Sequence, residues 1–376
     1  MLTTLLLLLV HAAAGYLVPT PPGKHNVTLT TGPLVDYSRN DPYAATVTPR
    51  ALMLSVFQPA KCASTMPAPY MPNKTAEYQG PFLQQNFQIA ANFTPLFQEA
   101  RLPVCAHHHR SCSPLEDVPI LLFSPGYGIP RLYYSVLASA IASEGFTVMT
   151  IDHPGDANII TYPNGHAVYA NDTSSVIEII QQHLLVRAAD VTSVIDQLSN
   201  ATAMAALLPQ RGYRPFPTDR IAMLGHSLGG ATAVTAAGKD DRLRGAINWD
   251  GTLYEPLPAS GLSQPVLFIA HGTADDDSWT QAWPLLTGPK LWLTINETQH
   301  QTFSDVPTLL QAAGQNATAY ADLLGTIAPA EMVRILTAYT TAWMKGAFAG
   351  HEGGPLLEGH QPDRFPEVST VMKANF

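Results

Sequence analysis

The chain has 376 residues, of which 46% are hydrophobic and 13% are charged, and its formal net charge is −9. This length is enough for a large core in one or two domains, and the composition excludes an intrinsically disordered protein. Because no block of lysine and arginine interrupts the acidic balance, we expect no nucleic-acid partner.

The N-terminus has the pattern of a secretory signal peptide. An apolar stretch from Leu5 to Val10 precedes small residues around Ala12–Gly15, and it is too short to span a bilayer. We therefore expect residues 1–15 to be a signal peptide and the mature protein to be secreted and extracellular. No later segment reaches about 18 apolar residues, so we expect no transmembrane segment, although a local apolar patch could contact lipid peripherally.

Glycosylation sequons support the same compartment. A sequon is the tripeptide Asn-x-Ser/Thr, and sequons are accepted in surface loops of secreted proteins. Seven occur, at Asn26, Asn73, Asn92, Asn171, Asn200, Asn296 and Asn316. We therefore expect a glycoprotein.

The three cysteines, Cys62, Cys105 and Cys112, predict one disulfide and one free thiol. The pairs Cys105–Cys112 and Cys62–Cys105 both remain open. Three consecutive histidines between Cys105 and Cys112 raise the question of a metal site. Because neighbouring side chains point in different directions, a solvated loop closed by a disulfide is the better interpretation, and we expect no metal.

The first third of the chain is rich in turn-forming residues. Residues 16–45 predict an extended N-terminal arm, and residues 51–59 predict the first strand. The segment near 59–117 holds many prolines and all three cysteines, which predicts an insertion with a helix near 82–101.

From residue 118 onward, short apolar runs alternate with helical patterns. The runs predict strands at 118–128, 145–155, 244–250, 264–272 and 290–296, and a strand that runs into a glycine-rich turn at 219–230. The helical patterns cover 132–145, 174–200 and 328–348. This alternation predicts an α/β fold with a mostly parallel central sheet and helices on both faces, and we interpret residues 16–376 as a single domain.

The sequence GHSLG at 225–229 fits the G-x-S-x-G pattern of a nucleophile elbow. It lies between a predicted buried strand and a helix of small residues, where a sharp turn would raise the hydroxyl of Ser227 above the sheet. The backbone N–H of Leu228 is the expected first donor of an oxyanion hole. The second is expected from the loop at 124–130, where Tyr127 lies between two glycines.

A serine nucleophile needs a base, and in this architecture the chain order is serine, acid, histidine. His300 follows the last predicted parallel strand and is the expected base. His226 is adjacent to Ser227 and should point away from it. His153 is expected to brace the site, and His271 to lie at its rim.

Two acidic segments could supply the residue that orients His300. Asp250 follows the strand after the elbow and lies next to apolar Trp249, whereas Asp275 begins a run of three aspartates. Three neighbouring carboxylates repel one another when buried, so that run suits a solvated loop or a helix start. We therefore favour Asp250 over Asp275, with Glu255 as a weaker third option.

Several segments together resemble the plasma-type platelet-activating factor acetylhydrolases, a family of secreted α/β-hydrolases, and particularly its fungal-like members. The segments are FSPGYGIPRLYYSVLASAIASEGF, IDHPGDAN, GHSLGGATA, INWDGTLYEP and HQTFSD. The resemblance implies the α/β-hydrolase fold, a triad of Ser227, Asp250 and His300, no calcium or other cofactor, and phospholipid substrates with a short or oxidised sn-2 acyl chain. This chain departs from the animal enzymes in its oxyanion loop, which has PGYG in place of an HGLG-like sequence.

The expected activity is that of a secreted serine hydrolase that cleaves carboxylic esters of small-molecule or lipid substrates through an acyl-enzyme. A cutinase or polyester hydrolase with the same fold is the alternative, and in that case the acid should be Asp275. A non-catalytic binding module is disfavoured because both the serine and the histidine are present. The sequence does not indicate an oligomeric state.

Overall fold

A ten-stranded mixed sheet forms the centre of the molecule in the computed structural model, which describes residues 15–86, 92–105, 112–170, 176–255, 257–272, 275–350 and 354–375. The strand order is β1-β2-β7-β6-β10-β11-β12-β13-β14, with β5 paired to β2. The six strands from β7 to β13 in this order are parallel, and β1, β2, β5 and β14 are antiparallel to their neighbours. The bounds are β1 (Asn26–Asn40), β2 (Pro49–Lys61), β5 (Ser113–Pro114), β6 (Ile120–Ser124), β7 (Thr147–Asp152), β10 (Ile221–His226), β11 (Leu243–Trp249), β12 (Val266–His271), β13 (Lys290–Ile295) and β14 (Val368–Ala374).

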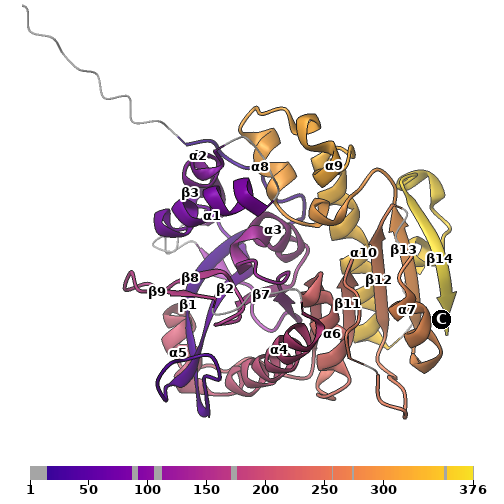
Figure 1. Ribbon diagram of the computed structural model, residues 1–376, viewed down its shortest axis with the longest axis horizontal. Coiled ribbons are helices and arrows are strands. Elements are labelled where there is room, and N and C mark those ends of the chain that lie inside the picture. The colour runs from indigo at the N-terminus through magenta and orange to yellow at the C-terminus, as the bar shows by residue number, and fades with distance from the viewer. Residues whose placement is uncertain are drawn as a thin grey trace, which may run out of the picture.

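Helices cover both faces of this sheet (Figure 1). One face packs against α3 (Ser135–Ser143), α8 (Val306–Ala312) and α10 (Pro329–Ala349). The other face packs against α4 (Ile177–Leu198), α5 (Ala201–Leu207), α6 (Leu228–Ala237) and α7 (Asp277–Ala282). The predicted α/β architecture is therefore confirmed.

Alternating side chains of the central strands enter two separate cores. In β6, Leu121 and Phe123 face the α3 side, whereas Ile120 and Leu122 face the α4 side. Because both faces are buried, each strand is a continuous apolar run rather than an alternating one. This explains why the sequence located these strands.

The remaining elements are short. They are β3 (Thr65–Pro69), α1 (Asn73–Asn86), α2 (Thr94–Glu99), β4 (Arg101–Cys105), β8 (Ile159–Thr161), β9 (Ala167–Tyr169), α9 (Ala321–Leu324), α11 (Gly354–Leu357) and the 3-10 helices η1 (Arg131–Tyr134), η2 (Pro209–Arg211), η3 (Trp283–Leu285), η4 (His300–Phe303), η5 (Ala317–Tyr320) and η6 (Pro362–Arg364). The predicted insertion thus contains a two-stranded sheet of β3 and β4 and two helices. The helix predicted near 82–101 is wrong in its extent, because α2 ends at Glu99 and β4 follows directly.

The strand predicted at 51–59 is present as β2, but the sequence missed the strand that precedes it. Residues 26–40, expected to lie in an extended arm, form β1 and pair along β2 in antiparallel register. β1 is an edge strand, and only an edge tolerates a residue such as Pro33, which has no N–H to donate to a neighbouring strand. At the opposite edge, the C-terminal segment contributes β14 beside β13.

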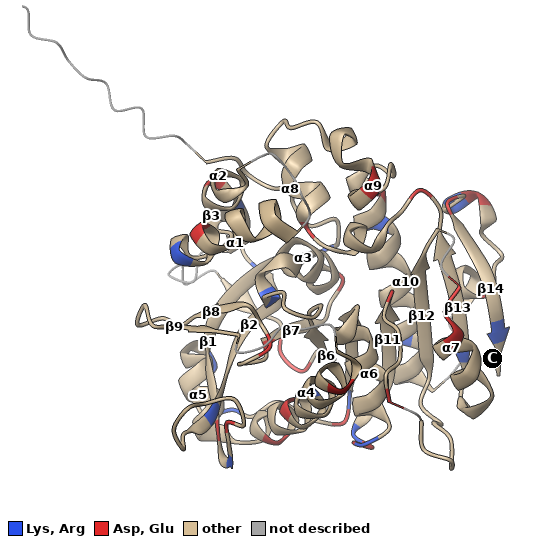
Figure 2. Ribbon diagram, in the orientation of Figure 1, with Lys and Arg blue, Asp and Glu red and all other residues tan. Residues whose placement is uncertain are grey.

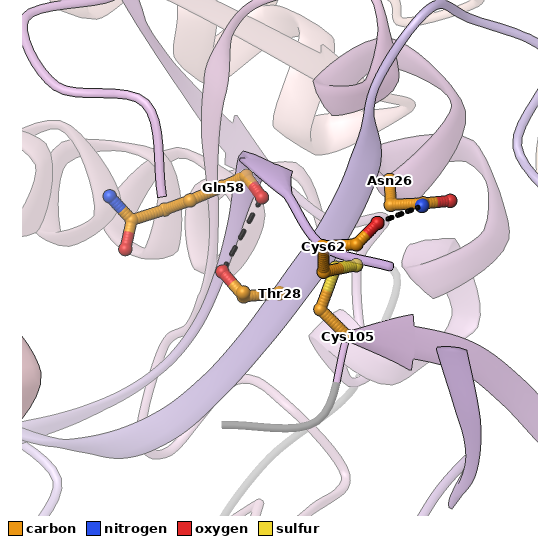
Figure 3. Close-up of a disulfide and its surroundings, with 5 residues drawn as sticks. All are labelled: Asn26, Thr28, Gln58, Cys62 and Cys105. Carbon is orange, nitrogen blue, oxygen red and sulfur yellow. Dashed lines mark hydrogen bonds between the residues drawn. A yellow bond between two sulfur atoms is a disulfide. The ribbon is translucent and has the colours of Figure 1, made fainter. Parts of the chain in front are cut away.

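The disulfide joins Cys62, just beyond β2, to Cys105 at the end of β4 (Figure 3). It is one of the two pairs left open by the sequence. Cys112 is the free cysteine, and the three sulfur atoms lie within 4.8 Å of one another. The loop expected to be closed by Cys105 and Cys112 is therefore not closed by its own disulfide, and its histidines, at 107–109, lie outside the described residues.

We expect this disulfide to stabilise the fold by about 2–4 kcal/mol, because it restrains the unfolded chain across 43 residues. The measurement is urea unfolding of the Cys112→Ser variant and of a double variant that adds Cys105→Ser. The Cys112→Ser background removes the alternative partner of Cys62. Equal stabilities of the two variants would contradict this expectation.

Charged residues are sparse, and the lysines and arginines are spread over several helices, strands and loops (Figure 2). None of the helices in the described part of the chain is long and apolar enough to cross a membrane.

Candidate active site

Ser227 occupies a sharp turn between β10 and α6. Its backbone has φ 56° and ψ −126°, a region that a residue with a side chain adopts only under strain. The turn requires glycines, because a Cβ on Gly225 would lie 2.0 Å from the carbonyl oxygen of Gly229, and a Cβ on Gly229 would lie 1.9 Å from that of Ser124. The predicted strand–turn–helix context of GHSLG is present.

The acid and the histidine meet beside this turn. His300, the first residue of η4, places its Nδ1 2.6 Å from Oδ2 of Asp250, which follows β11. The Ser227 N–H donates to the carbonyl of Trp249 at 2.8 Å, so the nucleophile turn contacts the residue that precedes the acid. The structure therefore brings together the loops that carry the three residues.

Asp250 is a buried carboxylate with several donors. Burial alone would raise the pKa of Asp250, but the hydrogen bonds from His271 and His300 hold this pKa well below its usual range. Asp250 is therefore ionised near neutral pH and can only accept, so Nδ1 of His300 carries the proton of their hydrogen bond. In a neutral imidazole this leaves Nε2 of His300 with a free lone pair, as a general base requires.

The competing acidic segment has a different role. Asp275 is exposed, and Asp276 caps α7 by accepting from the N–H groups of Ser278 and Trp279. Asp276 also accepts from the hydroxyl of Thr252 at 2.7 Å. The run of aspartates is thus a partly exposed helix start, as its composition suggested.

The loop at 124–130 lies against the nucleophile. A Cβ on Gly126 would be 3.6 Å from Cβ of Ser227, and Tyr127 packs in one apolar cluster with Leu228. Leu228 is the first residue of α6, and the first N–H groups of a helix have no carbonyl partner within it. Both residues predicted to supply oxyanion donors therefore flank Ser227.

Arg187, on α4, binds the backbone of the loop at 124–130. Its guanidinium donates to the carbonyls of Pro125 at 2.6 Å and Gly126 at 3.1 Å, and to the hydroxyl of Ser124 at 3.1 Å. Its charge is balanced by Asp156 through two contacts of 2.6 Å. Because Arg187 is buried, these hydrogen bonds are shielded from water and restrain the backbone of the loop.

A second buried network supports the same loop from the adjacent strand. His153 lies 2.9 Å from the Ser124 hydroxyl and 2.9 Å from Asp190, which agrees with its expected bracing role. Asp190 also accepts from Arg50 at 2.8 and 2.7 Å and from Arg39 at 2.8 Å. Although burial opposes ionisation, the cations hold the pKa of Asp190 far below its usual range.

We expect Asp190→Asn to reduce the free energy of unfolding by about 3–5 kcal/mol, because it leaves the buried Arg50 without its main anion. Asp196→Asn, an exposed position of the same helix, is the control and should cost less than about 1 kcal/mol.

The ion pair of Asp190 and Arg50 also predicts how the free energy of unfolding depends on pH. A carboxylate with a depressed folded pKa stabilises the protein above its unfolded pKa, about 3.9, and this contribution is lost as the pH falls towards the folded pKa. The stability gap between wild type and Asp190→Asn should therefore narrow below about pH 4. A gap that widens in acid would contradict the assignment.

His226 connects two parts of the site through its two ring nitrogens. Its Nε2 is 3.0 Å from the His300 carbonyl, which can only accept, so Nε2 carries a proton. Burial lowers the pKa of His226 well below its usual value, so its Nδ1 accepts from the Tyr134 hydroxyl at 2.9 Å. Tyr134 in turn accepts from the N–H of Gly126 at 3.1 Å. The oxyanion loop and the His300 backbone thus share one chain of hydrogen bonds.

The sequence did not indicate Arg187, Asp190 or Tyr134 as parts of the site. Arg187 and Asp190 are three residues apart on a long helix whose buried face is mostly apolar. Two opposite charges on a buried face are unusual enough to have been a signal. Tyr134 lies in a run of apolar residues and gave no signal.

The strand order, the strained serine turn and the adjacent acid–histidine pair define an α/β hydrolase. A family model described as "Platelet-activating factor acetylhydrolase, isoform II" matches residues 18–203 and 214–352. The chain therefore belongs to this family, and the resemblance inferred from the sequence is confirmed.

The similar proteins are esterases. A "Probable 1-alkyl-2-acetylglycerophosphocholine esterase" of Arthroderma benhamiae is 31% identical, with 94% of each chain covered. A "Platelet-activating factor acetylhydrolase" of Gallus gallus is 24% identical over 64% of each chain. A solved ferulic acid esterase from Streptomyces cinnamoneus is 28% identical, with a TM-score of 0.76, and covers 96% of this chain and 100% of its own. The chain is a carboxylic ester hydrolase.

Proposed function

We propose that this protein is a secreted serine esterase that removes short acyl groups, with the sn-2 acetyl ester of 1-alkyl-2-acetylglycerophosphocholine as the reference substrate. The main support is the hydrogen bond between His300 and Asp250 beside the strained Ser227 turn. The family and the Arthroderma relative support the substrate class.

The proposed reaction begins when Oγ of Ser227 attacks the ester carbonyl while Nε2 of His300 takes its proton. The N–H groups of Tyr127 and Leu228 stabilise the resulting oxyanion, and ionised Asp250 stabilises the imidazolium of His300. The proton then passes to the leaving alcohol, and an acyl-enzyme remains. Water then gives a proton to His300 and attacks the acyl carbon, the bond to Oγ of Ser227 breaks, and the acyl group leaves as a carboxylic acid while Oγ regains its proton. Since these steps use side chains, backbone N–H groups and water but no metal ion, we expect EDTA to leave the rate unchanged.

A substrate panel separates this proposal from its alternatives. It compares 1-alkyl-2-acetylglycerophosphocholine, the same lipid with a hexadecanoyl sn-2 chain, methyl ferulate and a polyester film. We expect the acetyl lipid to have a kcat/KM at least about tenfold above that of the long-chain lipid and of the ferulate. Release of soluble products from the film together with poor turnover of the acetyl lipid would favour the cutinase-type alternative.

Secretion is part of the proposal. Six sequon asparagines, Asn26, Asn73, Asn92, Asn200, Asn296 and Asn316, are exposed, while Asn171 and the predicted signal peptide up to residue 14 lie outside the described residues. The disulfide fits an oxidising compartment. Expression in a secreting eukaryotic cell should yield medium-borne protein that loses mass on treatment with peptide N-glycosidase. Retention of an unglycosylated chain inside the cell would refute this part.

A further inference from the structure

The carboxylate of Asp250 faces two histidines rather than one. Nδ1 of His271 lies 2.8 Å from Oδ1 and 2.9 Å from Oδ2, and the His271 backbone N–H lies 3.0 Å from Oδ1. Nδ1 of His300 lies 2.6 Å from Oδ2, the shorter of the two imidazole contacts to that oxygen. The reaction described above needs only the contact with His300, so the second imidazole has no assigned role.

The sheet places His271 at this carboxylate. His271 is the last residue of β12, which pairs with β11, and the Asp250 N–H donates to the carbonyl of Ile269 at 2.8 Å. Asp250 has a φ of 56°, so its backbone leaves the strand sharply and directs the side chain towards the end of β12. Asp250 is therefore held against β12 through both its backbone and its side chain.

The hydrogen-bonding chemistry fixes which atom carries each proton. An ionised carboxylate only accepts, so Nδ1 of His271 is a donor in either protonation state of the ring. The backbone N–H of His271 binds Oδ1, its ring Nδ1 lies within 2.9 Å of both oxygens, and Oδ2 faces His300. The terminal torsion of an aspartate is broad, so an unrestrained carboxylate could rotate away from His300.

We propose that His271 is a positioning residue for ester hydrolysis, which holds Oδ1 of Asp250 so that Oδ2 stays aligned with Nδ1 of His300. The inference rests on the proposed function. The side chain of His271 is 30% exposed and that of Asp250 is 5% exposed, so the carboxylate is shielded from solvent. A hydrogen bond to an ionised carboxylate is stronger than one between neutral groups.

Two substitutions separate this role from a packing role. His271→Asn keeps an N–H donor near the position of Nδ1, whereas His271→Leu keeps similar bulk and removes the donor. Because a hydrogen bond to a charged group is lost, we expect His271→Leu to lower kcat by about 10- to 100-fold, with KM changed by less than about twofold. His271→Asn should stay within about threefold of wild type. Active sites are titrated with a fluorophosphonate, so that kcat refers only to folded, reactive enzyme.

A double-mutant cycle with Asp250→Asn tests whether His271 acts through Asp250. Its readout is the further change in kcat when His271→Leu is added to the Asp250→Asn variant, and a purely structural role would not make this change smaller. If His271 acts through Asp250, adding His271→Leu to Asp250→Asn should lower kcat by less than about twofold further. A full, independent loss in the double variant would overturn the inference, as would a wild-type kcat per titrated site in His271→Leu. Equal impairment of the Asn and Leu variants would also overturn it. If wild type neither takes the label nor hydrolyses the ester, the proposed function fails first and this inference fails with it.

Discussion

Ser227→Ala is expected to lower kcat for ester hydrolysis by about five to six orders of magnitude, to the background rate. Without Oγ no acyl-enzyme forms, and the remaining acceleration can come only from binding and from the oxyanion donors. Alanine keeps the Cβ of serine, so the strain at φ 56° is unchanged and the fold should persist. The measurement is hydrolysis of the acetyl lipid, with thermal unfolding to confirm the fold.

The matched control is Ser199→Ala, an exposed serine just after α4, which should stay within about twofold of wild type. A Ser227→Ala variant that retains a substantial part of wild-type turnover, free of contaminating esterase, would remove Ser227 from the mechanism.

Asp250→Asn is expected to lower kcat by about 10⁴-fold, whereas Asp275→Asn should change it by less than about threefold. An asparagine can direct an N–H at His300, which would favour the tautomer whose Nε2 carries the proton and cannot accept one from Ser227. It also removes the negative charge that stabilises the imidazolium. Asp275 is exposed, so its loss should alter neither effect.

These two variants also distinguish the two hydrolase classes weighed from the sequence. In the cutinase-type alternative, the acid after the following strand would be essential and the order of sensitivity would be reversed. Strong impairment of Asp275→Asn with an active Asp250→Asn would therefore overturn both the acid assignment and the substrate argument that depends on it.

The central strands could be predicted because each is buried on both faces, which produces apolar runs such as the one in β6. The start of the sheet could not be predicted, because β1 combines proline, glycine and polar residues and depends on pairing with β2 for its structure. The helix boundaries near 82–101 failed for a local reason. Pro95, in the first turn of α2, begins a new helix, since the first turn does not need the missing N–H.

The site likewise combines residues that a local sequence pattern predicts with residues whose contacts depend on the folded structure. The position of Ser227 follows from a local motif, and the preference for Asp250 followed from strand order and from the cost of burying neighbouring carboxylates. The contacts of Arg187 with the loop at 124–130 join segments about 60 residues apart, and no local pattern encodes them. His271 was placed at the rim by the sequence, but its contact with Asp250 depends on how β11 and β12 align.

The central claim is that Ser227 is a nucleophile activated by His300 and oriented through Asp250. Its most direct test is labelling with a fluorophosphonate, followed by peptide mapping and by labelling rates for Asp250→Asn and Asp275→Asn. We expect one label per chain, on Ser227, at a rate that Asp250→Asn lowers strongly and Asp275→Asn leaves unchanged. A label on another residue, no label on folded wild type, or slowing by Asp275→Asn alone would contradict it.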